Sequence, residues 1–105
     1  MLKKLTVTAA LLAIHGAAIA GKALPRDVQA FVNNAEACEH LAGEWDSSLP
    51  QKDREEIERN IDKYCGNAKR QLGALKAKYK ANHGMLETID AHANDSVKSF
   101  VAESD

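Results

Sequence analysis

The chain has 105 residues, of which 45% are hydrophobic, with fourteen basic and fifteen acidic side chains and a formal net charge of −1. A chain of this length forms one small domain, whose core gives only marginal stability unless a covalent bond or a metal supports it. The balanced charge and an aromatic content of 5% argue against a nucleic-acid-binding protein, which needs basic surface and base-stacking side chains.

The first twenty residues have the pattern of a secretory signal peptide. Two lysines precede an apolar run of about ten residues, and the small residues Ala18 and Ala20 suit a signal peptidase. The run is too short to span a bilayer as a helix, which takes roughly twenty apolar residues. We therefore expect cleavage after Ala20, a periplasmic or secreted mature domain of residues 21–105, and no membrane span in that domain. The mature chain has twelve basic and fifteen acidic residues, a net charge of −3.

Cys38 and Cys65 are the two cysteines of the chain. In a small exported domain such a pair usually forms a disulfide, so we predict a bridge between them. It would close a loop of about 27 residues, for which the chain-entropy treatment gives about 3.5 kcal/mol of stabilisation. The alternative, a reactive thiol or a thiolate metal ligand, requires Cys38 to stay reduced in an oxidising compartment.

The spacing of apolar residues predicts helices throughout and no strands. The first helix is expected to begin at Pro25 and Asp27 and to end at Gly43. Its apolar face repeats every three or four residues and consists of Val28, Phe31, Val32, Ala35, Cys38 and Leu41. The second helix is expected to begin near residue 50, with Ser48 as its cap in a capping-box arrangement, and to end at Gly66. Its expected buried residues are Ile57, Ile61, Tyr64 and Cys65.

Two further helices follow in the prediction. Asn67 is expected to cap a third helix, which stops near residue 83, where Gly84 takes the left-handed conformation. A fourth apolar stripe runs from Met85 to Val101 and frays at the acidic end of the chain. The predicted fold is therefore an all-α bundle of three to four helices, stapled by one disulfide and preceded by a cleaved signal peptide.

The predicted bridge constrains the connection between the first two helices. Cys65 lies at the end of the expected second helix, about 22 Å from its start, whereas a disulfide needs Cα atoms within about 7 Å. We therefore expect residues 43–49 to form an ordered strap that runs back along the second helix. Trp45 is expected to pack under this strap as a small satellite core, in preference to lying exposed as a binding residue.

Three stretches carry a resemblance to a known family. They are CEHLAGE at 38–44, the acidic helix that ends in Cys65, and LGALKAKY at 72–79. Together they resemble an uncharacterised family of small exported proteobacterial proteins with a Cys-Glu-His-x-x-Gly-Glu motif, a second cysteine and a Leu-rich segment ending in Lys-Tyr or Arg-Tyr. The resemblance implies a secreted helical domain and makes the first stretch a signature, but it brings no activity with it.

Polar side chains around Cys38 form the first candidate site. Glu36 and His40 are four residues apart, so they can meet on the helix surface, and Glu44 lies within reach of His40. A histidine with two carboxylates is a ligand set for zinc or copper. The spacing is not diagnostic of metal, and the favoured interpretation is that these three residues cap the helix end and the strap backbone. Glu39 is counted with them as a candidate contact for a partner or a metal. Contact with a partner is the alternative.

Charge is unevenly distributed along the second half of the chain. Residues 63–80 contain six basic residues and no acidic one, whereas residues 84–105 contain five acids and one lysine. If the last helix packs on the third, the two segments neutralise each other. The functional alternative is a basic surface for an anionic partner such as a cell-wall polymer, lipid headgroups or an acidic protein. Its candidate residues are Lys69, Arg70, Lys76, Lys78 and Lys80.

Catalytic motifs are missing from the sequence, which has no zinc-protease helix, no Gly-rich phosphate loop and no serine-hydrolase elbow. The acidic residues 53–58 alternate with basic ones and indicate a solvated face, not a carboxylate pair for glycoside cleavage. We expect a non-catalytic binding protein of the inhibitor or immunity type, with no cofactor and no resident metal, whose partner is an envelope protein or an anionic cell-wall component. A metal-binding envelope protein that uses His40 and a small envelope hydrolase stay open as alternatives, and the oligomeric state is not predicted.

Overall fold

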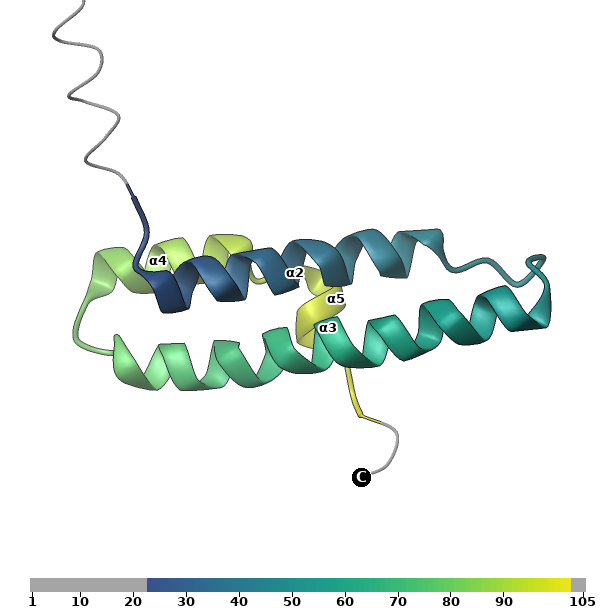
Figure 1. The fold of residues 1–105 in the computed structure, drawn as a ribbon. Coiled ribbons are helices and arrows are strands. Elements are labelled where there is room, and N and C mark those ends of the chain that lie inside the picture. Colours follow the sequence, from purple (N-terminus) through teal and green to yellow (C-terminus); the bar gives the residue numbers. More distant parts are fainter. Residues whose placement is uncertain (1–22, 103–105) are drawn as a thin grey trace, which may run out of the picture.

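The computed structural model describes residues 23–102, and within that range every regular element is a helix (Figure 1). The helices are α2 (Arg26–Glu44), α3 (Gln51–Lys78), α4 (His83–His92) and α5 (Asp95–Ser99). The predicted all-α bundle of three to four helices is confirmed, while the predicted signal peptide, residues 1–20, lies outside the described residues. None of the helices in the described part of the chain is long and apolar enough to cross a bilayer.

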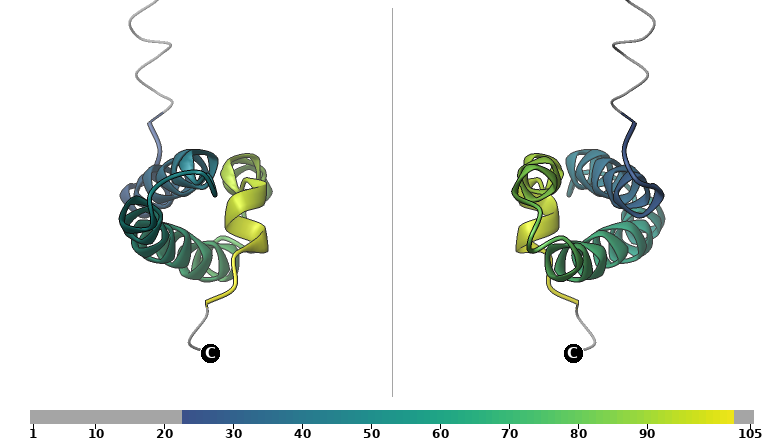
Figure 2. Two further views of the ribbon diagram at one scale, coloured as in Figure 1. Left: turned by 90° about the vertical axis from the view of Figure 1, so that its right-hand side faces the viewer. Right: turned by 90° about the vertical axis from the view of Figure 1, so that its left-hand side faces the viewer.

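α2 and α3 form a long antiparallel pair, and α4 and α5 lie along it as a third layer (Figure 2). The core lies where all three layers meet. Every buried residue on α2 belongs to the apolar face that the sequence predicts. The fully or almost fully buried hydrophobic residues are Val28, Phe31, Val32, Ala35, Cys38, Cys65, Ala68, Leu75, Ile89, Ala93 and Val97.

α3 is one continuous helix of 28 residues, so the predicted helix end at Gly66 and the predicted cap at Asn67 are wrong. Gly66 is buried, and a Cβ atom at this position would lie 3.6 Å from Cε2 of Phe100. The Phe100 ring therefore packs against α3 at Gly66, at a distance that is an ordinary van der Waals contact. Glycine lowers helix propensity by about 1 kcal/mol relative to alanine, but packing of the third layer on α3 decides the outcome here.

The other helix ends also differ from the prediction. α2 continues through Gly43 to Glu44, and α3 begins after Pro50 without any side-chain cap. The backbone N–H and the hydroxyl of Ser48 instead donate to Oδ1 of Asp46, at 2.9 and 3.0 Å. These two hydrogen bonds hold the pKa of the Asp46 carboxyl below its usual value.

Asparagine side chains define the two C-terminal helices. Asn82 accepts a hydrogen bond from the Met85 N–H and starts α4, and Asn94 accepts one from the Val97 N–H and starts α5. The predicted fourth stripe is therefore divided into two helices. Gly84 lies inside α4, and no glycine in the described residues has a positive φ, so the predicted left-handed turn is wrong.

The predicted disulfide between Cys38 and Cys65 is present, with the Cα atoms 4.7 Å apart. Cys65 lies inside α3, about 21 Å from the start of the helix, whereas Cys38 lies only about 9 Å from the end of α2. The segment that connects α2 to α3 must therefore span the difference between these two distances. Gly43 and Glu44 stay helical, and residues 45–50 carry the chain past the end of α2 to the start of α3 (Figure 1).

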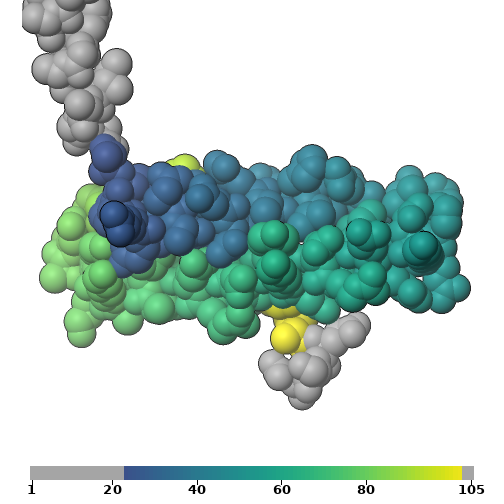
Figure 3. All heavy atoms as spheres, viewed as in Figure 1, coloured from purple at the N-terminus to yellow at the C-terminus, as the bar shows by residue number. Residues whose placement is uncertain are grey.

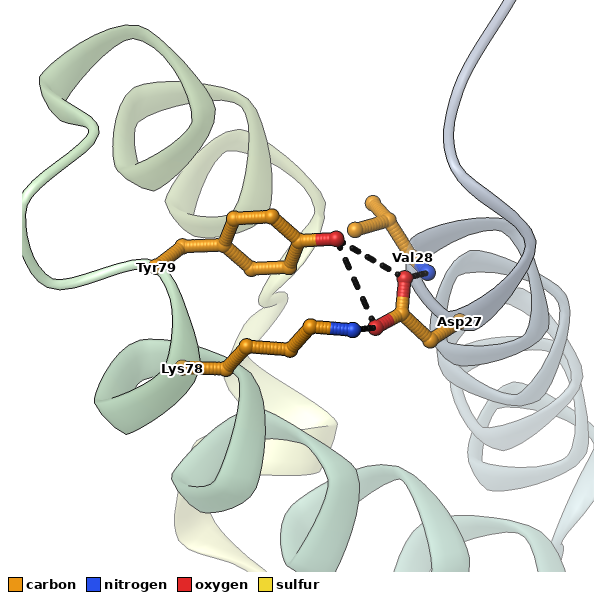
Figure 4. Close-up of polar contacts among 4 residues, drawn as sticks. All are labelled: Asp27, Val28, Lys78 and Tyr79. Atoms are coloured by element: carbon orange, nitrogen blue, oxygen red, sulfur yellow. Dashed lines mark hydrogen bonds and ion pairs between the residues drawn. The ribbon is translucent and has the colours of Figure 1, made fainter.

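Side-chain contacts also join α2 and α3, near the start of α2 (Figure 4). Nζ of Lys78 donates to Oδ2 of Asp27 at 2.6 Å, and the Tyr79 hydroxyl donates to Oδ1 at 3.1 Å. The hydrogen bond from Lys78 lowers the pKa of the Asp27 carboxyl, and the hydrogen bonds from Tyr79 and Val28 lower it further. Partial burial of the carboxyl acts in the opposite direction and raises its pKa. The same contact raises the pKa of Lys78.

Buried residues stop at the disulfide. On α2 the last one is Cys38, and on α3 the first one is Cys65. None of the residues 39–64 between them is buried. We term this segment the arm. In Figures 1 and 3 it is the blue and teal end of the molecule, where α2 and α3 continue beyond α5.

Replacing both cysteines by alanine is expected to remove about 3.5 kcal/mol of stability, because the loop of 27 residues is no longer closed in the unfolded state. For a domain of this size that corresponds to a melting temperature lower by roughly 15–25 °C. Circular dichroism melts of the variant, the oxidised protein and the reduced protein measure it. Equal melting temperatures for the variant and the oxidised protein would contradict the prediction.

The Asp27 contact predicts a pH-dependent contribution to stability. Because the pKa of Asp27 is lowered in the folded state, the contribution is present above the ordinary aspartate pKa of about 3.9 and is lost as pH falls through the lowered value. Asp27→Asn should therefore lower the melting temperature at pH 7, and the difference from wild type should shrink on acidification below about pH 4. A difference that is the same at pH 7 and pH 2.5 would show that the Asp27 charge contributes nothing.

Candidate functional site

The polar cluster around Cys38 lies on the last two turns of α2. His40 and Glu44 form the contact that the structure shows, with Nε2 of His40 2.8 Å from Oε2 of Glu44. Both side chains are well exposed, at 71% and 50% of their full area. Glu36 and Glu39 are exposed on the same helix. Glu44 reaches His40 from within the helix, not from the strap that the sequence predicts.

The cluster offers few ligands for a metal. Both cysteine sulfurs are bonded to each other, so neither is available as a thiolate. Within residues 23–102 no three His, Cys, Asp or Glu side chains are close enough together to hold an ion. His40 and Glu44 therefore form a two-residue surface pair, which an i, i+4 spacing on a helix favours by itself.

Trp45 is not the satellite core that the sequence predicts. The residue is 39% exposed, and its indole N–H donates to Oε2 of Glu58 on α3 at 2.8 Å. Trp45 immediately follows the last residue of α2 and has extended backbone angles. Because α2 continues one residue past Gly43, to Glu44, the indole lies against the flank of α3 and not beneath a strap.

A groove between the two helices of the arm is a surface feature that the sequence did not predict. It has a volume of about 540 Å³ and is open to solvent. Three half-buried aliphatic side chains, Leu41, Leu49 and Ile57, come from α2, the connection and α3 respectively. The remaining lining residues are polar: Glu44, Asp53, Glu56 and Asn60.

The arm is acidic. Its 26 residues include eight acidic and four basic side chains, which gives a net charge of −4. The mature chain carries −3 in total, so the remainder of residues 21–105 carries +1. No ion pair or side-chain hydrogen bond of Asp53 or Glu56 is present among the described residues. Both residues are exposed to solvent.

The predicted basic surface lies along the other half of α3, and the fold uses much of its charge internally. Lys69 donates to the backbone carbonyls of Lys98 and Phe100, at 2.8 and 2.7 Å. Lys76 lies 3.5 Å from Asp90 of α4, and Lys78 contacts Asp27 of α2.

Two further cations belong to this surface. The Arg70 side chain donates to the Asn67 side chain on the same helix, and Lys80 is exposed just beyond the end of α3. Three of the five candidate cations, Lys69, Lys76 and Lys78, thus hold α3 to the other helices or to the segment after α5.

The groove could not be read from the sequence because its lining comes from three separate segments. A partial signal exists in α3, where Asp53, Glu56 and Asn60 are spaced around Ile57 at helical intervals. The apolar pattern predicts Leu41 and Ile57 as buried residues, and the structure leaves both half-buried. The apolar pattern does not reveal that neither α4 nor α5 covers these two residues.

Comparison of the chain with protein-family models, curated proteins and solved structures finds no match. The resemblance to a family of exported helical proteins therefore stays a prediction.

Trp45 is the one tryptophan of the chain, so its fluorescence reports on the arm alone. Because Trp45 is 39% exposed, its indole should be readily quenched by acrylamide in the folded, oxidised protein. Unfolding in urea should raise the quenching constant only moderately. Quenching that is nearly absent until the protein unfolds would place the indole in a core and contradict the structure.

Proposed function

We propose that the protein is an exported, non-catalytic binding protein that contacts its partner through the arm. The observation that supports this most is the groove of Leu41, Leu49 and Ile57, which lies beyond the disulfide where no third helix of residues 23–102 covers the hairpin. Apolar side chains left half-covered on a small domain are typical of an interaction surface.

The chemistry of the arm favours binding over catalysis. A carboxyl group that acts as a general acid needs an apolar environment from which water is excluded. The carboxylates Glu44, Asp53 and Glu56 are exposed at the edge of an open groove. The His40–Glu44 pair supplies two potential metal ligands, which is fewer than the three or four protein ligands of zinc sites.

Export is supported by two independent features. The first twenty residues have the order of charge, apolar run and small residues that a signal peptidase recognises. The disulfide is a bond that persists in oxidising compartments and is rare in the cytosol. The proposal is therefore a periplasmic or secreted chain that begins at Gly21.

Mass spectrometry of the protein recovered from the periplasm and the medium tests the export part. We expect an N-terminus at Gly21 and two cysteines that resist alkylation until a reductant is added. A chain that keeps its first twenty residues and stays in the cytoplasm with free thiols would refute export.

Site-directed photo-crosslinking in the native host tests the binding part. A photoreactive residue at position 56, in the groove, is expected to form a discrete crosslinked product. The matched control carries the same residue at position 91, an exposed site on α4 outside the arm. Crosslinks that are equal at both positions, or absent from position 56, would refute binding through the arm.

A further inference from the structure

We propose that the groove of the arm receives a cationic amphipathic helix of a partner protein. This inference rests on the proposed function and specifies the chemistry of the partner. It is carried by the shape, the charge and the length of the surface that Leu41, Leu49 and Ile57 form with their acidic neighbours.

The shape favours a macromolecule over a small ligand. Pockets for small molecules enclose most of the ligand surface, whereas this groove is open to solvent between two helices. A helix that lies in a hydrophobic groove places apolar side chains into it at intervals of three and four residues. α4 and α5 already pack in this manner along the other half of the same pair (Figure 2).

The negative charge of the groove indicates which residues lie beside the apolar stripe of the partner helix. Glu44, Asp53 and Glu56 line the groove, and Asp53 and Glu56 have no partner among the described residues. The arm as a whole carries −4. Lysine or arginine beside the apolar stripe would meet these carboxylates, whereas an anionic polymer or an acidic protein would be repelled.

The same charge argues against a second copy of this chain as the occupant. A symmetric dimer through the groove would place one acidic arm against another. A head-to-tail contact would need the basic half of α3, where Lys76 and Lys78 already contact Asp90 and Asp27. A partner of different composition fits better.

The length of the surface sets the size of the partner helix. From Gln51 to Tyr64, α3 spans about 20 Å of the arm. A helix of about fourteen residues, or four turns, would cover this distance. The third layer of α4 and α5, which covers the core half of the hairpin, would then have an intermolecular counterpart on the arm.

Titration of the mature, oxidised chain with synthetic peptides tests the inference. The probe is a fourteen-residue leucine–lysine peptide with a helical apolar stripe, and Trp45 fluorescence and calorimetry measure Kd. We expect saturable one-to-one binding that weakens as salt is raised. Two control peptides, one with glutamate in place of lysine and one with the same composition but no stripe, should bind at least about tenfold more weakly.

Charge-reversal variants locate the binding site. Asp53→Lys with Glu56→Lys reverses two groove charges, and Glu36→Lys with Glu87→Lys reverses two exposed charges outside the arm. Both pairs change the net charge equally. We expect Kd for the leucine–lysine peptide to rise about tenfold or more for the groove pair and less than about threefold for the control pair. If Asp53→Lys impairs folding, as a circular dichroism melt would show, Glu56→Lys alone is compared with Glu87→Lys.

The remaining outcomes each overturn the inference. Equal effects of the two variant pairs would mean general charge attraction without a site, and equal binding of the acidic peptide would refute the charge argument. A concentration-dependent dimer that the groove variant abolishes would make a second copy the occupant. If position 56 crosslinks to a partner but the leucine–lysine peptide does not bind, this inference fails while the proposed function stands.

Discussion

The disulfide between Cys38 and Cys65 joins α2 and α3 at the point where the third layer of helices ends. On one side of it, three layers bury a continuous set of apolar residues. On the other side, two helices alone leave every residue at least partly accessible. Two helices cannot bury much apolar area, and the arm is joined to the core by the unbroken continuation of α2 and α3 and by the disulfide between them. The boundary between the packed core and the open arm therefore coincides with this bond.

Much of the fold could be predicted because helical periodicity and cysteine chemistry are local signals. The buried face of α2 and the pairing of Cys38 with Cys65 are as the sequence indicates. The glycines misled the prediction because their effect on a helix depends on what packs against them. Gly66 ends no helix and instead lies inside α3, where the Phe100 ring packs beside it. No pattern within α3 contains that information.

The site was harder to predict than the fold. The sequence draws attention to His40 and its carboxylates because they cluster along the chain, and to the basic residues because they form a run. In three dimensions, His40 and Glu44 form a surface pair, and Lys69, Lys76 and Lys78 contact the rest of the chain. The groove combines Leu41, Leu49 and Ile57 from three segments. Whether such residues are covered depends on where α4 and α5 end, which is a tertiary property.

Amide hydrogen exchange along α3 in the oxidised protein tests most directly whether the packed core ends at the disulfide. The helix is continuous, so propensity alone gives no reason for a step in the middle of it. The account predicts that amides of residues 56–63, in the arm, exchange much faster than those of residues 68–76, which lie under the third layer. Uniform protection on both sides of Cys65 would contradict it.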